Sequence, residues 1–386
     1  MNTIFFNSHT FLTKEVESAL RKHPDLNVLT VNIPQHPSVS SIDSIIDQIQ
    51  FFFPALIISI NDAGLDYEGI LQSVLINKGC YIVNWYHDYP FYEELFFGRK
   101  MNPCKERIDF VSEESFVPEM QNRSFNVFFL PLATDLHFFS DLPSTIKRDV
   151  SFVGNSSSYF IDSLVTEERG KEVQKLLPLM GMLKKKYYND STFNVRDFLI
   201  NCKSEWQSRT NLPDEELLFI LEWLCGYFYR RDFIKSIDNR YPSNFTCFGD
   251  ADWKHFINPL HVSTAACYYT TLQDIYKSTK VNLNINRIQI RTSFTQRIFD
   301  CSACGAFILT DKRKLNDLLF TTSGTKKDLI QFSSLDECCT LIDYYLKHDD
   351  ERMEIARRAR ETVLQNHTYD KRIAKIIELC RNTWEI

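Results

Sequence analysis

One segment of the chain has the residue types and the spacing of an anion-binding site. Ser293, followed three residues later by Gln296, has the pattern of a capping box and predicts a helix that begins there and runs to Cys304. The apolar runs 281–285 and 306–309 on either side read as buried strands. In a unit of strand, helix and strand, the helix N-terminus lies at the carboxyl edge of the sheet, where its free N–H groups and its dipole attract anions.

Three arginines and one aspartate accompany this predicted helix start. Arg287, Arg291 and Arg297 lie near it in the sequence and favour a phosphate or diphosphate ligand. Asp300 lies about two turns into the helix on the face of Arg297, where its carboxylate is suited to accept ribose hydroxyls. Two alternatives stay open: an ordinary capped helix with solvated arginines, and an ordinary pair of Asp300 with Arg297 at i, i+3.

The first third of the chain alternates short apolar runs with amphipathic stretches. The runs typical of buried strands are 3–6, 27–31, 55–60, 81–86, 108–111 and 127–130. The stretches of helical length are 12–21, 41–52 and 67–77. This repetition predicts a parallel sheet with helices on both faces, a Rossmann-like domain. The turn 7–10 after the first run lacks Gly-x-Gly-x-x-Gly, so no dinucleotide is expected in this half.

A second α/β domain is expected after the polar break 141–149. The apolar run 150–153 reads as its first strand and leads into Gly154. The segment 160–237 is mostly helical, and strands return at 244–248 before the anion-site segment.

Composition and charge exclude several classes of function. The 386 residues carry 44 Lys and Arg against 50 Asp and Glu, a net charge of -6, so no nucleic acid partner is expected. The longest apolar stretch, 51–60, is interrupted by Pro54 and is half the length that a membrane span requires, so no transmembrane segment is expected. Residues 1–7 do not read as a signal peptide, which predicts a cytoplasmic protein.

The 11 cysteines predict no disulfide framework and no metal site. They are odd in number and scattered, as expected of reduced thiols in a cytoplasmic chain. Cys301 and Cys304 form the one Cys-x-x-Cys, but no second pair completes a set of four zinc ligands.

Several phrases in the last 240 residues resemble one family. The phrases are LPLA at 130–133, RDVSFVG at 148–154, FGDADW at 248–253, IYKSTKVNLNI at 275–285, RIFDCSACGAF at 297–307 and HTY at 367–369, before Arg372. Read together they resemble the CgeB-like glycosyltransferases, named after a spore maturation protein and related to the glycosyl transferases group 1 of the GT-B fold. The first third resembles the family in its organisation and in the phrase 85–90.

The resemblance implies a GT-B architecture of two facing Rossmann-like domains. The donor, a nucleoside diphosphate sugar, is held mainly by the second domain, and the acceptor enters between the two. The expected divisions are an acceptor-side domain at 1–145, a donor-binding domain at 146–365 with a helical insertion at about 160–237, and a C-terminal helix at 366–386 that packs back on the first domain.

The resemblance also implies which residues hold the donor. Gly154 and Asn155 match the glycine loop that opens the donor domain, and Gly249 and Asp250 match a loop near the base. The diphosphate-facing helix start matches Ser293, Phe294, Thr295, Gln296 and Arg297. Asp300 matches a position usually held by a ribose-binding Glu, and the shorter Asp draws the carboxylate back by about one methylene.

His87 and Asp88 are the expected catalytic residues. They follow the predicted strand 81–86 and would face the cleft from the acceptor side, where Asp88 acts as a general base or orients the acceptor and His87 contacts the transferred sugar. A turn capped by Asp88 before Pro90 is the alternative.

The expected activity is that of a glycosyltransferase of the hexosyltransferase type without a cofactor. The helix N-terminus and the arginines, in place of a metal, stabilise the leaving group. The letters Asp250-Ala251-Asp252 read as a base-side loop better than as a metal clamp. The expected acceptor is a glycan, a protein or a small molecule. An epimerase or hydrolase acting on nucleotide sugars and a catalytically silent nucleotide-sugar or protein binder are the rival functions.

Overall fold

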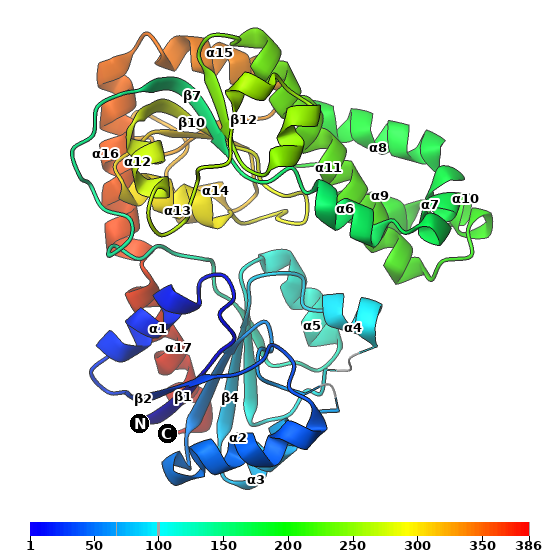
Figure 1. The fold of residues 1–386 in the computed structure, drawn as a ribbon, viewed down its shortest axis with the longest axis vertical. Helices are drawn as coiled ribbons and strands as arrows, with labels where there is room; N and C mark the ends of the chain where they lie inside the picture. Colours follow the sequence, from blue (N-terminus) through cyan, green and yellow to red (C-terminus); the bar gives the residue numbers. More distant parts are fainter. Residues whose placement is uncertain (67, 99–100, 386) are drawn as a thin grey trace. The chain divides into compact units, whose positions relative to one another are not determined.

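The chain divides into two units, each built around its own parallel sheet (Figure 1). The structure is a computed structural model that describes residues 1–66, 68–98 and 101–385. Unit 1 comprises Met1–Asp135 and Asn366–Ile386, and unit 2 comprises Leu136–Gln365. The division therefore falls about ten residues before the boundary at 145 that the sequence predicts, because residues 140–147 form hydrogen bonds with Gln273 and Asp274 of unit 2.

Unit 1 contains a six-stranded parallel sheet in the order β2-β1-β3-β4-β5-β6. Its strands are β1 Asn2–Asn7, β2 Asn27–Asn32, β3 Leu56–Ile60, β4 Tyr81–Tyr86, β5 Arg107–Val111 and β6 Val127–Phe129. All six predicted strands are present. The central strand β3 is buried along its whole length, which explains why it reads as an almost continuous apolar run. β5 is also buried throughout, and it carries the charged residues Arg107 and Asp109 into the interior.

The helices of unit 1 cover this sheet, and the last helix of the chain is one of them. They are α1 Thr13–Lys22, α2 Ile42–Ile49, α3 Ile70–Asn77, α4 Tyr92–Phe97, α5 Val117–Asn122 and α17 Tyr369–Trp384. Figure 1 shows α17 beside α1, and the two helices pack against each other. The Arg372 guanidinium of α17 donates to the carbonyl oxygens of Pro131 (2.7 Å) and Leu132 (3.1 Å). This anchors the C-terminal segment to unit 1.

Unit 2 contains a second six-stranded parallel sheet, in the order β12-β11-β10-β7-β8-β9. Its strands are β7 Arg148–Val153, β8 Phe245–Phe248, β9 Val262–Ser263, β10 Thr279–Asn284, β11 Ile308–Asp311 and β12 Ile330–Phe332. Counted within the unit this order is 6-5-4-1-2-3, the doubly wound arrangement in which the chain reverses direction across the sheet. The reversal lies between β7 and β10. With this sheet, the expected α/β class is confirmed in both units.

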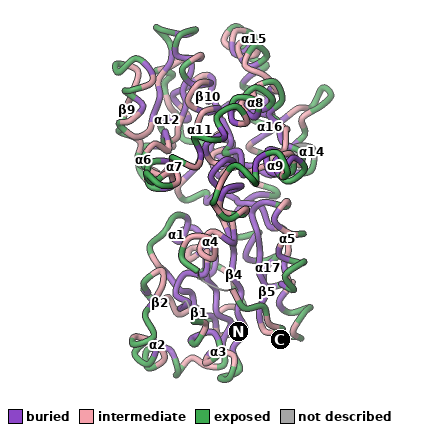
Figure 2. The backbone as a smooth tube through the Cα atoms, turned by 90° about the vertical axis from the view of Figure 1, so that its right-hand side faces the viewer, coloured by how far each residue is buried: buried purple, intermediate pink, exposed green. Residues whose placement is uncertain are grey.

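A helical insertion separates the first two strands of unit 2. It consists of α6 Ser158–Leu164, α7 Glu167–Gln174, α8 Leu177–Asn189, α9 Val195–Asn201, α10 Lys203–Trp206 and α11 Asp214–Arg240. The long helix α11 buries residues on most of its circumference. The insertion helices α6, α8 and α9 pack on it, and Phe233 in its C-terminal half stacks on Phe332 of β12. Figure 2 shows buried backbone through the strands and α11, and exposed backbone on the outer helices.

Five further helices complete unit 2. They are α12 Leu272–Lys277, α13 Gln296–Ala303, α14 Asn316–Leu319, α15 Leu335–Tyr345 and α16 Asp349–Asn366. No helix in the described part of the chain is both long enough and apolar enough to cross a membrane.

Candidate functional site

The carboxyl ends of β7 and β10 meet at the point where the strand order of unit 2 reverses. Gly154 and Asn155 follow β7, and Ile285 and Asn286 follow β10. In open parallel sheets, ligands bind at this switch point because the two following loops leave in opposite directions and open a crevice between them. Two arginines converge on these loops from α11 and α13.

Arg297, in the first turn of α13, spans both strand ends. Its Nη1 donates to the carbonyl oxygen of Val153 (2.7 Å), and its Nε donates to Oδ1 of Asn284 (2.9 Å). The side chain is half-buried, and this burial lowers the pKa of the guanidinium to about 10. Arg297 is therefore positively charged at neutral pH and is held between β7 and β10 by neutral oxygens.

Arg230 reaches the same loops from α11. Its Nη2 donates to the carbonyl oxygen of Ile285 (3.2 Å), its Nη1 to that of Asn155 (3.5 Å), and its Nε has no hydrogen-bond partner within the described residues. Burial lowers the pKa of Arg230 well below its usual value, and the positive charges of Arg297 and Arg287 lower it further.

The arginine pair, Arg230 and Arg297, lacks a counter-charge in direct contact. Neither guanidinium forms an ion pair with a carboxylate in the described part of the chain. Asp311, which favours the charged form of both, is already paired with Arg313 (2.8 Å). Burial of a cation that contacts only carbonyl oxygens costs free energy, and a bound anion offsets this cost. This geometry therefore fits a bound phosphate or diphosphate.

The predicted loop residues Gly154, Gly249 and Asp250 build the floor of this site. A Cβ on Gly154 would lie 2.6 Å from Nη1 of Arg297, and a Cβ on Gly249 would lie 2.4 Å from the carbonyl oxygen of Gly154. That oxygen accepts from Nε1 of Trp253 (2.8 Å), and Oδ2 of Asp250 accepts from the backbone N–H of Ser156 (2.8 Å). The two glycines allow close packing, and Asp250 braces the loop after β7.

Substitution of Gly154 by alanine tests this packing. We expect Gly154→Ala to push the Arg297 guanidinium out of place and to weaken the binding of inorganic pyrophosphate by about fivefold, the value of one hydrogen bond of about 1 kcal/mol. Gly181→Ala in α8 is the matched control, because a Cβ there meets no atom within 4 Å and should leave affinity unchanged. Isothermal titration of both variants measures the difference, and equal affinities would show that Gly154 does not set the arginine's position.

The start of α13 differs from the sequence prediction. The helix begins at Gln296 with Thr295 as its N-cap, and no side-chain cap hydrogen bond is made. Oδ1 of Asn286, from the loop after β10, accepts from the backbone N–H of Thr295 (3.2 Å). Ser293 is buried before the helix, and the ring of Phe294 packs against Phe320. The capping box at Ser293 is therefore wrong, because the sheet edge supplies the partner that a local cap would have supplied.

The three arginines predicted at this helix start have different surroundings. Nη2 of Arg291 is paired with Oε1 of Glu222 from α11 (2.7 Å), so its charge is neutralised. Arg287 is exposed, and its guanidinium lies over the ring of Trp223 (5.6 Å). Of the three, Arg297 lies directly at the switch point, and Arg230 of α11 joins it there.

Asp300 is fully buried one turn into α13. Its Oδ2 accepts from the hydroxyl of Tyr268 (2.9 Å), and its Oδ1 accepts from Nε2 of Gln296 (3.0 Å). Arg297 instead bonds to Val153 and Asn284, so the alternative of a simple Asp300–Arg297 pair does not describe the side chains.

The Cys-x-x-Cys of α13 forms part of the core. Cys301 and Cys304 are both fully buried, and burial raises the pKa of both thiols. Among the residues that the structure describes, no group of three or more His, Cys, Asp or Glu side chains is placed to hold a metal ion.

The predicted catalytic residues lie in unit 1, after β4. Oδ1 of Asn61 accepts from the backbone N–H of His87 (2.8 Å), and Nδ2 of Asn61 donates to Oδ2 of Asp88 (3.2 Å). Asp88 is exposed. The His87 ring contacts Trp85 edge to face, and its Nε2 is buried without a hydrogen-bond partner among the described residues. Burial lowers the pKa of His87 to about 3, so its imidazole is neutral at pH 7.

This low pKa gives the protein a defined sensitivity to acid. The folded state binds a proton at His87 less readily than the unfolded state, whose histidine has a pKa of about 6.5. The contribution of His87 to the free energy of unfolding is therefore fully present above pH 6.5. It decreases as the pH falls toward 3, by up to about 1.4 kcal/mol per pH unit. We expect His87→Gln, which does not titrate, to lose less stability between pH 7 and pH 5 than the wild type in urea unfolding. Equal losses would contradict the buried, neutral imidazole.

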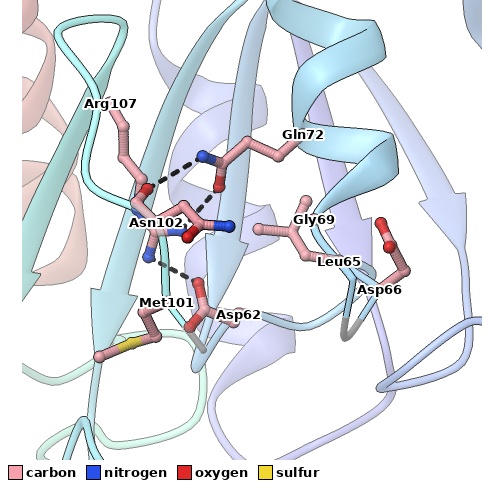
Figure 3. Close-up of a pocket in the computed structure, with 8 residues that line it drawn as sticks. All are labelled: Asp62, Leu65, Asp66, Gly69, Gln72, Met101, Asn102 and Arg107. Atoms are coloured by element: carbon pink, nitrogen blue, oxygen red, sulfur yellow. Dashed lines mark hydrogen bonds and ion pairs between the residues drawn. The ribbon is translucent and has the colours of Figure 1, made fainter. Parts of the chain in front are cut away.

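A second charged cluster in unit 1 is saturated with internal partners. Figure 3 shows Arg107 between Gln72 and Asp62, with which its guanidinium bonds at 3.0 and 2.7 Å. The same group also bonds to Asp109 and to the hydroxyl of Tyr86. The adjoining cavity measures about 10 Å³, room for a single water. This cluster ties β4 and β5 to the loop after β3 and to α3, and its cavity has no space for a substrate.

The sequence alone does not identify three residues of the site, Arg230, Tyr268 and Asn284. Arg230 stands in a helical segment whose neighbours at i+3, i+4 and i+7 are apolar and buried, Phe233, Ile234 and Ile237. A charged residue on an apolar helical face is a signal that could have marked it. Tyr268 and Asn284 carried no such signal, because their contacts with Asp300 and Arg297 join segments distant in the sequence.

Comparison with known proteins finds one family-model match. Residues 230–378 match the family model described as "Glycosyl transferase-like". No curated protein matches the chain in sequence.

Solved structures of other proteins share the fold over nearly the whole length of the chain. Sucrose-phosphate synthase from Thermosynechococcus elongatus is similar with a TM-score of 0.53 at 10% identity, covering 100% of this chain and 99% of that one. HepE from Anabaena in complex with UDP-glucose is similar with a TM-score of 0.52 at 10% identity, covering 99% of this chain and 100% of that one. The chain thus combines a glycosyl transferase-like region, which includes the arginine pair and α13, with the two-unit GT-B fold of the glycosyltransferases.

Proposed function

We propose that the protein transfers a sugar from a nucleoside diphosphate sugar to an acceptor hydroxyl without the help of a metal ion. The observation that carries the proposal is the arginine pair at the switch point of unit 2, held by neutral oxygens and without a carboxylate partner in the described chain. A diphosphate supplies the missing negative charge. The match of residues 230–378 to the glycosyl transferase-like model supports the same assignment.

The arginine pair is suited to the chemistry of the leaving group. As the bond from the sugar to the diphosphate breaks, negative charge grows on the diphosphate oxygens. Guanidinium groups in a partly desolvated site stabilise this charge more than water does, and their positions are fixed before the reaction by Val153, Asn284 and Ile285. The N-terminus of α13 adds its dipole. The positive charge that a metal would contribute is then provided by the chain itself.

Unit 1 is proposed to supply the acceptor-side chemistry. Asp88 is exposed and is oriented by Asn61, as suits a general base for an acceptor hydroxyl. A neutral His87 is suited to hydrogen-bond to a sugar hydroxyl without adding charge. We further propose that the protein is of the CgeB-like kind, on the phrases RDVSFVG and RIFDCSACGAF. UDP-hexoses are the first donors to test, because HepE was solved with UDP-glucose.

Removal of metal ions gives a direct prediction. If the arginine pair neutralises the leaving group, sugar transfer in the presence of excess EDTA should stay within about twofold of the untreated rate. Rates with EDTA and with EDTA followed by excess Mg²⁺ or Mn²⁺ form the comparison. A loss of more than tenfold with EDTA, reversed by added metal, would show that a metal takes part.

A nucleotide-sugar binder without transferase activity is the second candidate. The observation that favours it is the complete burial of Asp300, which keeps that carboxylate from solvent. Incubation of the protein with UDP-glucose, with and without an acceptor library, separates the possibilities. Transfer products support the proposed function, free sugar or an epimer without acceptor supports a hydrolase or epimerase, and binding without any product supports the silent binder.

A further inference from the structure

A cavity of about 280 Å³ lies at the carboxyl ends of β11 and β12 in unit 2. Its lining includes Lys312, Arg313 and Lys314, which follow β11, Ser333, which follows β12, and Thr192 from the segment between α8 and α9. The volume is close to the lower limit of about 300 Å³ for small-molecule sites. The cavity therefore has room for a small ligand and not for a whole nucleotide sugar.

Lys312 and Lys314 bring two positive charges to this cavity. Both residues are exposed, and neither ammonium group forms an ion pair or a hydrogen bond with any residue that the structure describes. Asp190 also lines the cavity, but its Oδ1 accepts from the backbone N–H (2.9 Å) and the hydroxyl (2.6 Å) of Thr192. Two like charges at one small cavity repel each other, and an anion bound between them offsets this repulsion.

Arg313 fixes the segment that carries the two lysines. Its side chain is buried, and its Nη1 donates to the carbonyl oxygen of Ser191 (3.0 Å), between α8 and α9. Its Nη2 donates to the hydroxyl of Tyr187 (3.0 Å) and to Oδ2 of Asp311 (2.8 Å). Its Nε is buried without a hydrogen-bond partner among the described residues, a cost in free energy that a polar ligand in the adjoining cavity offsets. The insertion and the end of β11 are thus joined before a ligand binds, which lowers the entropy cost of binding.

The cavity uses other residues than the proposed diphosphate site. Asp311 stands between them: its Oδ1 accepts from the backbone N–H (3.0 Å) and from Nδ2 (2.7 Å) of Asn286 in the loop after β10, and its Oδ2 accepts from Arg313. Neither member of the arginine pair lines the cavity. An anion bound by the two lysines would therefore occupy a site of its own.

We propose that this cavity is a second anion site, which binds the phosphate group of a small molecule. Lysine ammonium groups bind phosphate as compact point charges. The hydroxyls of Thr192 and Ser333 add hydrogen-bonding groups for the rest of the molecule. Inorganic phosphate and a sugar phosphate share this chemistry, and the experiment distinguishes them.

Isothermal titration of the whole protein with inorganic phosphate, glucose 6-phosphate and glucose tests the site. We expect glucose 6-phosphate to bind, glucose not to bind, and the double variant Lys312→Gln/Lys314→Gln to bind the phosphate ligand at least about tenfold more weakly. Lys326→Gln/Lys347→Gln is the control, because it removes the same charge from two lysines of unit 2 that do not line the cavity, and it should stay within about twofold of the wild type. Tighter binding of glucose 6-phosphate than of inorganic phosphate assigns the site to a sugar phosphate, and equal affinities assign it to free phosphate.

Arg230→Met separates this inference from the proposed function. It should bind glucose 6-phosphate within about twofold of the wild type, because Arg230 does not line the cavity. Loss of phosphate binding in Arg230→Met but not in the lysine variant would overturn the inference, because the phosphate would then occupy the arginine pair. Equal losses in the lysine variant and its control, or no binding of either phosphate ligand by the wild type at about 10 mM, would also overturn it. If the wild type binds glucose 6-phosphate through the two lysines but binds no UDP, ADP or GDP, the proposed function fails and this inference stands.

Discussion

Replacement of Arg230 by methionine should weaken nucleotide binding and at the same time stabilise the ligand-free protein. Methionine fills a similar volume without a charge. Binding should fall by about 10- to 150-fold, because a hydrogen bond to a charged group contributes about 1.5–3 kcal/mol. The melting temperature of the free protein should rise by about 2–4 °C, since the variant no longer buries a cation without a carboxylate partner.

The neighbouring arginine is a matched control for this prediction. Arg231 is paired with Asp232 (2.9 Å) and lies over the ring of Phe228 (4.9 Å). Arg231→Met should therefore leave nucleotide affinity within about twofold of the wild type and should not raise the melting temperature. Titration calorimetry and thermal unfolding of the two variants measure both effects. If Arg230→Met were destabilised and bound nucleotide normally, Arg230 would be a structural residue.

Substitution of Asp88 by asparagine should remove most of the transferase activity without a change in donor affinity. Asparagine keeps the size of the side chain and an oxygen for Nδ2 of Asn61, but it cannot take a proton from the acceptor. A positioned general base contributes about 10²–10⁴-fold, so kcat should fall by that range. Donor affinity should stay within twofold, because the proposed diphosphate site is built from residues of unit 2.

An exposed acid of the same unit controls for the change in charge. Asp25 forms an exposed pair with Arg381 (3.0 Å), so Asp25→Asn should keep full activity. Steady-state kinetics with a fixed acceptor and varied donor distinguish kcat from donor affinity. An Asp88→Asn variant with unchanged kcat would assign Asp88 to the turn after β4 and would leave the general base to another residue.

Much of the fold could be predicted because buried parallel strands have a strong local signal. The runs 81–86 and 150–153 correspond to β4, Tyr81–Tyr86, and to most of β7, Arg148–Val153. Strand-helix alternation then leaves few ways to connect the strands, because parallel connections are right-handed. The two-residue strand β9, Val262–Ser263, was missed since two residues carry no periodicity.

The site was harder to predict because its side chains are paired across long distances in the sequence. The sequence marks Gly154 and Arg297 as candidates, and the structure brings both to the end of β7. The charge of Arg291 is cancelled by Glu222, 69 residues away, which no local pattern reveals. For the same reason the start of α13 was misplaced: Asn286 at the sheet edge, and not Ser293, bonds to the backbone there.

Titration calorimetry of the whole protein with UDP, ADP, GDP and inorganic pyrophosphate tests the central claim most directly. The account predicts that pyrophosphate binds, that one nucleoside diphosphate binds more tightly, and that both affinities fall at least about tenfold in Arg230→Met and Arg297→Met but not in Arg231→Met. Binding that is equally strong in all three variants would contradict the claim that the arginine pair at the switch point holds the diphosphate.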